Sequence, residues 1–316
     1  MLESTVKNFC INFNVASEGR TFRSGQLVSG HVSFDLSKKT KITDISMRLK
    51  GQAHIHWSTG GGKKRRKRNY SANVTYFDLK SVILQENSAI GESVKLQAGT
   101  HMYPFTCQIP QGDFPPSFKG VCGKIEYMLT VSIHRPWHMS KDFVTELNLI
   151  NSINTNQPEL RAPLSGSNQM TLCCLWCASP AITMTVSVEK KAFTPGETVK
   201  IICEFSNGSS RTATPKVKLL QKQTFYTHER VNRRVYDKNL ASGFGQPIHA
   251  QTCDVHTEMM VLIPQSASLT ISNCSILVVS YSIEVSVTVC SGPDLTVLFP
   301  IIVCDTPVHP QPPPYV

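Results

Sequence analysis

The sequence predicts an all-β fold with two immunoglobulin-like β-sandwich domains in tandem. Three observations lead to this prediction. Apolar and polar residues alternate over many short segments, turns that contain Gly or Pro separate these segments, and no long helical period is present. The chain has 316 residues, which is close to the length of two domains.

Alternation with a period of two is the primary evidence for each strand, because successive side chains of a strand point to opposite faces. β-Branched and aromatic residues fill the alternating positions, as a pleated surface favours. In the first half these positions are Phe9, Ile11, Phe13 and Val15; Val28, Gly30, Val32, Phe34 and Leu36; and Ile125, Tyr127, Leu129, Val131 and Ile133. In the second half the clearest runs are Ile182–Val188, Val199–Phe205 and Leu277–Val289.

Residues 154–169 are mostly polar, contain two prolines and show little periodicity, which is typical of a linker. We therefore expect four parts: a sandwich over 1–153, a linker over 154–169, a second sandwich over 170–305 and a Pro-rich tail over 306–316. We expect the tail to be short and disordered, because chain ends rich in proline rarely fold by themselves.

An internal similarity supports two related domains. Thr21–Phe34 and Ala192–Phe205 both have a Phe, a Gly three residues later and an alternating strand that ends in Phe. In the second copy Pro195-Gly196 fits the centre of a type II turn, in which glycine supplies the positive φ. Coincidence between two amphipathic strands is the alternative explanation, and the equal spacing of the matches argues against it.

The basic charge of the chain is concentrated in one loop. The formal net charge is +10, and one run holds six of these charges, so the remainder carries only +4. Such a distribution argues against nucleic-acid binding, which needs basic residues over a docking surface. The functional interpretation of the run is an anionic lipid or phosphate site, and a nuclear-localisation signal and a merely solvated loop are the alternatives. Its residues are Lys63, Lys64, Arg65, Arg66, Lys67 and Arg68.

The remaining chemistry-bearing residues indicate neither a metal site nor an active site. Cys174 and Cys177 form a C-x-x-C pair without a second ligand pair, and His54 and His56 share a strand face without a third ligand. The sequence shows no phosphate-binding loop or nucleophile motif, so we expect no catalysis, no cofactor and no small-molecule substrate. The first residues do not resemble a signal peptide, and we expect a cytoplasmic protein whose cysteines are mostly buried thiols.

The tail contains the motif with the most specific chemistry. Prolines favour the extended polyproline II conformation, so little entropy is lost when a partner binds it. The spacing P-P-x-Y is typical of ligands for WW domains, whose aromatic groove takes the prolines while a neighbouring pocket takes the tyrosine. A Pro-rich tail without a partner is the alternative. The motif comprises Pro312, Pro313, Pro314 and Tyr315.

Several segments together resemble one known family. They are Thr21-Phe22, Lys50-Gly51-Gln52-Ala53, Pro115-Pro116-Ser117-Phe118, Gly123–Tyr127 and Arg135-Pro136-Trp137 in the first half, and Cys173-Cys174, Trp176-Cys177, Phe193–Glu197 and Asn273-Cys274 in the second. Over nearly the whole chain they are similar to the arrestin fold, and in particular to the α-arrestins, the arrestin-domain-containing proteins. The sequence departs from the family pattern at Lys119, where an acidic residue is usual, and in having one proline-tyrosine motif instead of two.

The resemblance implies arrestin-type sandwiches and a cytosolic adaptor. Such an adaptor links membrane cargo, namely receptors or transporters, to HECT-type ubiquitin ligases that carry WW domains, at the plasma membrane and endosomes. Ubiquitination then directs the cargo into endocytosis and endosomal sorting. The alternative is a structural subunit of an endosomal coat, similar to the arrestin-like component of retromer, which needs no ligase motif.

Overall fold

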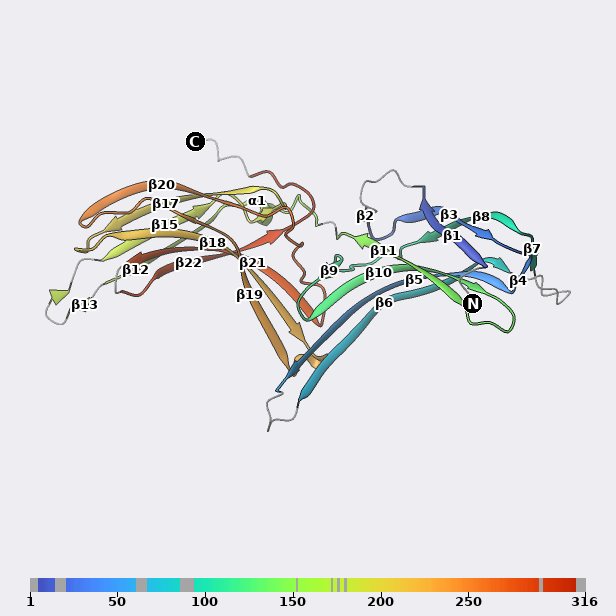
Figure 1. Ribbon diagram of the computed structural model, residues 1–316. Helices are drawn as coiled ribbons and strands as arrows, with labels where there is room; N and C mark the ends of the chain where they lie inside the picture. The colour runs from blue at the N-terminus through green and yellow to red at the C-terminus, as the bar shows by residue number, and fades with distance from the viewer. Residues whose placement is uncertain are drawn as a thin grey trace. The chain divides into compact units, whose positions relative to one another are not determined.

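The predicted strands are present in the computed structural model of the chain (Figure 1). The structure describes residues 5–14, 21–60, 67–85, 94–151, 153–171, 173–174, 177–178, 181–289 and 292–310. They form two units. The first holds the chain up to Asn151 together with Tyr226–Asn232 and Asn273–Ile276, and the second holds the rest. The all-β prediction is confirmed.

The first unit is a sandwich of two sheets (Figure 1). One sheet has the order β1 (Val6–Phe13), β3 (Leu27–Leu36), β8 (Gly99–Gln108). The other has the order β2 (Thr21–Phe22), β11 (Lys141–Leu149), β10 (Gly123–His134), β5 (Asp44–Thr59), β6 (Arg68–Gln85), with β9 (Phe118–Lys119) paired to β10. A separate pair joins β4 (Thr40–Ile42) to β7 (Val94–Leu96).

The core of the first sandwich follows the predicted alternation. All five alternating positions of β3 and all five of β10 are buried, while the residues between the β3 positions are only partly buried. β1 is less regular, because a bulge between Lys7 and Cys10 includes Asn8 at a positive φ of 50°. A bulge shifts the alternation along a strand, so Val6 before it and Ile11 after it are both buried although they lie five positions apart, while Phe9 and Phe13 are partly buried.

The second unit repeats this architecture (Figure 1). One sheet has the order β12 (Leu164–Met170), β15 (Ile182–Val188), β17 (Thr198–Asn207), β20 (Thr252–Leu262). The other has the order β16 (Ala192–Phe193), β22 (Leu295–Val303), β21 (Leu277–Val289), β18 (Ala213–Tyr226), β19 (Arg233–Phe244). Smaller elements of this unit are the helix α1 (Pro158–Arg161) and the hairpin of β13 (Cys173–Cys174) with β14 (Cys177–Ala178), whereas the 3-10 turn η1 (His228–Arg230) belongs to the first unit.

The internal similarity in the sequence marks equivalent elements of the two sandwiches. Phe22 on β2 and Phe193 on β16 are both fully buried, and each short strand pairs in parallel with the last long strand of its unit. Gly25 and Gly196 follow at positive φ angles of 76° and 87°. The Glu197 N–H donates to the Thr194 carbonyl at 3.1 Å, which closes the predicted turn around Pro195-Gly196.

The span that the sequence predicts as a linker is structured over much of its length. It contains α1 and most of β12, which pairs with β15 along its whole length from Leu164 to Met170. β12 lies at the edge of its sheet, and five of its seven residues are Ser, Gly, Asn or Gln. An edge strand of this composition has no apolar alternation, so its sequence is indistinguishable from that of a loop. Among the described residues, no helix has the length and apolar character to cross a membrane.

Candidate functional site

The segment that follows β22 leads to the proline-tyrosine motif, and the structure describes its first part. Residues 304–310 run along the second sandwich, and Val308 is almost completely buried. The residues that surround it form a small separate core: Leu160, Ala192 and Cys304, with Ile153 and Ile302 at its edge. This apolar cluster fixes the base of the tail to the sandwich by excluding water from the Val308 side chain.

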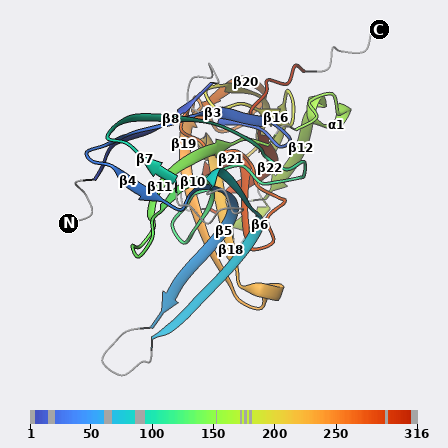
Figure 2. The same ribbon diagram turned by 90° about the vertical axis from the view of Figure 1, so that its right-hand side faces the viewer.

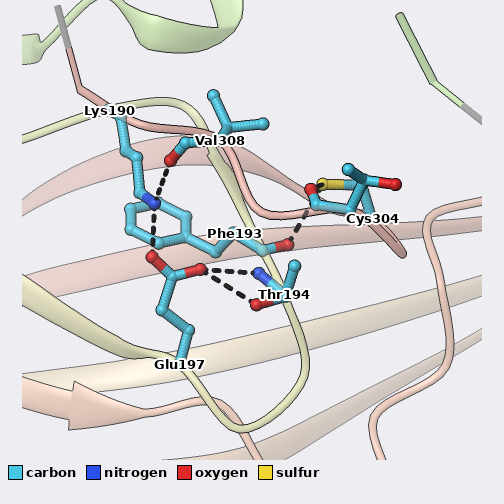
Figure 3. A network of polar contacts seen from close by, with 7 residues as sticks. Lys190, Phe193, Thr194, Glu197, Cys304 and Val308 are labelled. Carbon is cyan, nitrogen blue, oxygen red and sulfur yellow. Dashed lines mark hydrogen bonds and ion pairs between the residues drawn. The ribbon is translucent and has the colours of Figure 1, made fainter. Parts of the chain in front are cut away.

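A buried lysine adds a polar anchor at the same place (Figure 3). The Lys190 Nζ donates to the Val308 carbonyl at 2.5 Å and forms an ion pair with Glu197. The Lys190 side chain is only 4% exposed, whereas that of Glu197 is 25% exposed. A buried ammonium is costly unless it is paired and hydrogen-bonded, and here both conditions are met.

Glu197 is itself held by the turn that precedes β17. Its Oε2 accepts hydrogen bonds from the Thr194 N–H at 2.8 Å and from the Thr194 hydroxyl at 3.2 Å, so the other oxygen remains for Lys190. Lys190 also lies over the ring of Phe193, 4.9 Å from its centroid, in a cation–π contact. The turn sequence Thr-Pro-Gly-Glu thus orients the carboxylate that neutralises the buried lysine.

Cys304 links β22 to the same turn. Its N–H donates to the Phe193 carbonyl at 2.9 Å, and its thiol lies 3.5 Å from that oxygen and 3.2 Å from the Thr306 carbonyl (Figure 3). Burial raises the pKa of the Cys304 thiol, so it stays protonated at neutral pH and acts as a donor. Cys304 therefore has a structural part in the anchor and is a poor nucleophile.

The predicted WW ligand Pro312–Tyr315 lies outside the described residues, of which Pro310 is the last. Pro312 follows the anchored Val308 by four positions, so the backbone between them can extend at most about 14 Å. A second segment of similar sequence, Pro115–Phe118, is not available to a partner. Both of its prolines and Phe118 are buried, and the Tyr127 hydroxyl donates to the Pro115 carbonyl at 2.7 Å.

The basic run is described only in part. Lys63, Lys64, Arg65 and Arg66 lie outside the described residues, Lys67 precedes β6, and Arg68 is its first residue, paired with Thr59 of β5. Trp57 and Tyr70 stack across the two strands with centroids 5.3 Å apart, which stiffens this end of the hairpin. The run therefore connects two long paired strands at the end of a hairpin.

Neither of the two strand histidines belongs to a metal-binding cluster among the described residues. His54 and His56 lie on the face of β5 opposite the buried Ile55, and His54 contacts Asn73. Among the residues that the structure describes, no three His, Cys, Asp or Glu side chains come together as a metal site would require. Cys174 and Cys177 pair across the β13–β14 hairpin by their backbones.

The anchor of Lys190, Glu197 and Val308 was not predicted. The sequence contains one clue: a Glu directly follows the Pro-Gly turn, and a Lys lies three positions before Phe193, where its side chain can reach that turn. No local sequence pattern marks Val308 as part of the anchor, because its partner Lys190 is 118 positions away in the sequence.

Comparisons with known proteins agree with this architecture. Residues 9–156 match the model of the arrestin (or S-antigen) N-terminal domain, and residues 179–308 match that of the arrestin (or S-antigen) C-terminal domain. Mouse arrestin domain-containing protein 4 is 26% identical over 310 residues, which cover 96% of this chain and 72% of the relative. Human thioredoxin-interacting protein is 24% identical over 301 residues, which cover 94% of this chain and 74% of the relative.

The two family models together match most of the chain, and each match falls largely on one of the two sandwiches. The relatives align across both domains and not with one alone. The chain therefore belongs to the arrestin family and, within it, to the α-arrestins.

Proposed function

We propose that this chain is an adaptor that recruits HECT-type ubiquitin ligases to membrane cargo. In this proposal Pro312–Tyr315 binds a WW domain of the ligase, and the arrestin sandwiches bind the cargo, a receptor or transporter. Ubiquitination of the cargo then promotes its endocytosis and endosomal sorting. The function requires binding surfaces only, with no cofactor and no small-molecule substrate, and it places the protein in the cytoplasm, at the plasma membrane and endosomes.

One observation carries the proposal: a P-P-x-Y motif follows an anchored segment after only a few residues. Lys190 and the apolar cluster hold Val308 against the second sandwich, and Pro312 begins four positions later. The first proline of this motif would therefore lie within about 14 Å of Val308. A short connection keeps a bound ligase close to cargo on the same adaptor and raises its effective concentration there.

The test uses the full chain and a purified WW domain from a HECT-type ligase. Tyr315→Ala removes the side chain that would fill the tyrosine pocket, and we expect at least about tenfold weaker binding by fluorescence polarisation. Val316→Ala, at the next position, is the matched control and should bind like the wild type. Undiminished binding by Tyr315→Ala would reject the adaptor proposal.

The retromer-like alternative is separated by an experiment in cells. Deletion of Pro312–Val316 should abolish ubiquitination of the cargo if the chain recruits a ligase. If it is instead a structural coat subunit, cargo sorting and cargo ubiquitination should both continue without the motif.

We also propose that the basic run Lys63–Arg68 binds an anionic lipid or phosphate group. Six basic residues at the end of the β5–β6 hairpin could contact several anionic headgroups at once, each contributing about 1 kcal/mol at low salt. Replacing all six with Ser should weaken binding to vesicles that contain phosphatidylserine. Vesicle binding that is equally strong in this variant and in the wild type would contradict the proposal.

A further inference from the structure

The loop between β10 and β11 exposes two large apolar side chains at the end of the first sandwich. Trp137 is fully exposed, at 102% of its reference area, and Met139 is 85% exposed. Among the described residues, most exposed large apolar side chains lie on strands, whereas these two lie in one loop, two positions apart. Exposed tryptophan and methionine on a projecting turn indicate a contact surface, because water is a poor environment for both.

The loop has a defined conformation that keeps Trp137 in place. β10 and β11 stay paired up to Ile133 and Lys141, so only a short connection remains. Within it the His138 N–H donates to the Arg135 carbonyl at 3.3 Å, and the His138 ring lies 2.7 Å from the Pro136 carbonyl through Nδ1. Trp137 has a positive φ of 59°, which is uncommon for a bulky residue and points to a functional constraint.

Three hydrogen bonds to backbone carbonyls bring other segments of the first sandwich to the same end. The Thr43 N–H donates to the His134 carbonyl at 2.9 Å, the Lys141 Nζ lies 3.4 Å from the Val6 carbonyl, and the Ser37 N–H donates to the Thr5 carbonyl at 3.1 Å. The β4–β7 pair belongs to this end as well, and Figures 1 and 2 both show it near the β10–β11 loop.

Among the residues that the structure describes at this end, basic side chains outnumber acidic ones. In the segments 5–8, 35–44, 94–101 and 134–142 the basic residues are Lys7, Lys38, Lys39, Lys41, Lys95, Arg135 and Lys141. The acidic residues of the same segments are Asp35, Asp44 and Asp142. Asp35 accepts hydrogen bonds from Asn8 and Thr100, and Asp44 lies 3.7 Å from His134. Among the described residues of these segments, seven basic residues therefore accompany three acidic ones at the end of the sandwich that carries Trp137 and Met139.

We propose that this loop is a membrane-contact site, which inserts Trp137 and Met139 into the headgroup region of an anionic phospholipid bilayer. Tryptophan prefers the boundary between headgroups and acyl chains, and lysines beside it attract anionic lipids. A protein partner fits less well, because a stable interface buries about 800 Å² on each side, and two side chains on a narrow turn offer far less. A bilayer accepts a projecting aromatic side chain without a matching pocket.

This site is distinct from the basic run. The His134 end of β10 pairs with Asp44 at the start of β5, whereas the run follows the other end of that strand, after Thr59. The 16 residues of β5 span about 50 Å. The proposal is also independent of the proline-tyrosine motif, so variants can test the two sites separately.

The first experiment measures partition of the full-length protein onto vesicles of phosphatidylcholine, with and without phosphatidylserine. Trp137→Ala removes only an exposed side chain, so the fold should be kept, and binding to the anionic vesicles should fall about tenfold. Val121→Ala, at another loop residue that is 69% exposed, is the matched control and should bind like the wild type. Lys38→Ser combined with Lys39→Ser should also weaken binding about tenfold, and more at low salt.

A second readout tests directly whether Trp137 enters the bilayer. Brominated lipids in the anionic vesicles should quench the wild-type tryptophan fluorescence, and Trp137→Phe should lose this quenching although Trp57 and Trp176 remain. Several results would overturn the proposal: unchanged partition of Trp137→Ala, quenching that persists in Trp137→Phe, or loss of binding only when Lys63–Arg68 is neutralised. A protein partner that depends on Trp137 while vesicles do not bind would assign the loop to protein contact instead.

Discussion

Each sandwich contains an equivalent four-residue turn, but the side chain at the fourth position makes different contacts in the two. In the first it is Arg23–Gln26 and in the second Thr194–Glu197, each with a glycine at positive φ in third position. In both, the fourth residue is tied by its backbone to an Ile-Pro-Gln segment: the Ile109 N–H donates to the Gln26 carbonyl at 3.0 Å, and the Ile263 N–H donates to the Glu197 carbonyl at 2.9 Å. The backbone geometry of the turn is therefore a property of the fold.

The difference lies in the side chain at the fourth position. Gln26 accepts a hydrogen bond from the Arg23 N–H at 2.9 Å, just as Glu197 accepts one from the Thr194 N–H at 2.8 Å. The carboxylate, however, has a second charged oxygen, which pairs with the buried Lys190, and Lys190 in turn binds the Val308 carbonyl. A carboxylate in place of an amide at the fourth position thus allows the turn of the second sandwich to anchor the tail through Lys190.

Among the variants that test this difference, Lys190→Met is expected to lose the most stability. The substitution leaves the Glu197 carboxylate and the Val308 carbonyl without their buried donor, and we expect a loss of about 3 kcal/mol in the free energy of unfolding. Chemical denaturation of the second sandwich measures it. Lys191→Met, at the next position, removes a lysine that is only partly buried and should change stability by less than about 0.5 kcal/mol. Equal effects of the two substitutions would contradict a role for the buried charge.

Exchanging the residues at the fourth position of the two turns should lower the stability of the two sandwiches by unequal amounts. Glu197→Gln keeps the hydrogen bond to Thr194 but leaves Lys190 without a counter-charge, and we expect a loss of about 2 kcal/mol. Gln26→Glu places a carboxylate at a partly exposed position that already accepts an N–H, so its cost should stay near zero. Thermal denaturation of both variants measures the difference, and a double variant of Lys190→Met with Glu197→Gln should recover part of the stability that Lys190→Met loses.

The sequence predicted the two sandwiches because their central strands combine strict alternation with β-branched residues, as β3, β10, β17 and β21 do. It also identified the repeated turn. It did not identify the edge strand β12, whose partners are backbone groups of β15 and whose Asn168 amide donates to the Thr296 carbonyl. Edge strands need no apolar face of their own, so period-two alternation does not find them.

The residues of the candidate site also fall into two groups, those that a local sequence pattern predicts and those that it does not. The proline-tyrosine motif and the basic run are local patterns, readable from consecutive residues, and their functions remain proposals. The Lys190 anchor and the end of the sandwich that carries Trp137 depend on contacts between distant segments, such as Lys141 with Val6. A local sequence pattern does not predict which distant segments come into contact. The Ile-Pro-Gln repeat at 109–111 and 263–265 was available in the sequence and would have strengthened the equivalence of the two turns.

The smallest expected effect concerns the glycines that the two turns share. Gly25→Ala and Gly196→Ala each place a Cβ at a positive φ, and in each case the nearest atom is the Oε1 of the glutamine in the Ile-Pro-Gln segment, Gln111 or Gln265, at 2.1 Å. The end of a flexible side chain can move aside, so the cost is mainly that of the backbone conformation, about 1 kcal/mol in each sandwich. Denaturation of the single variants should give equal losses, because the backbone of the turn is the shared part. A markedly larger loss for Gly196→Ala would show that the Lys190 anchor also constrains the backbone of its turn, and that the difference between the sandwiches is not confined to the side chain at position 197.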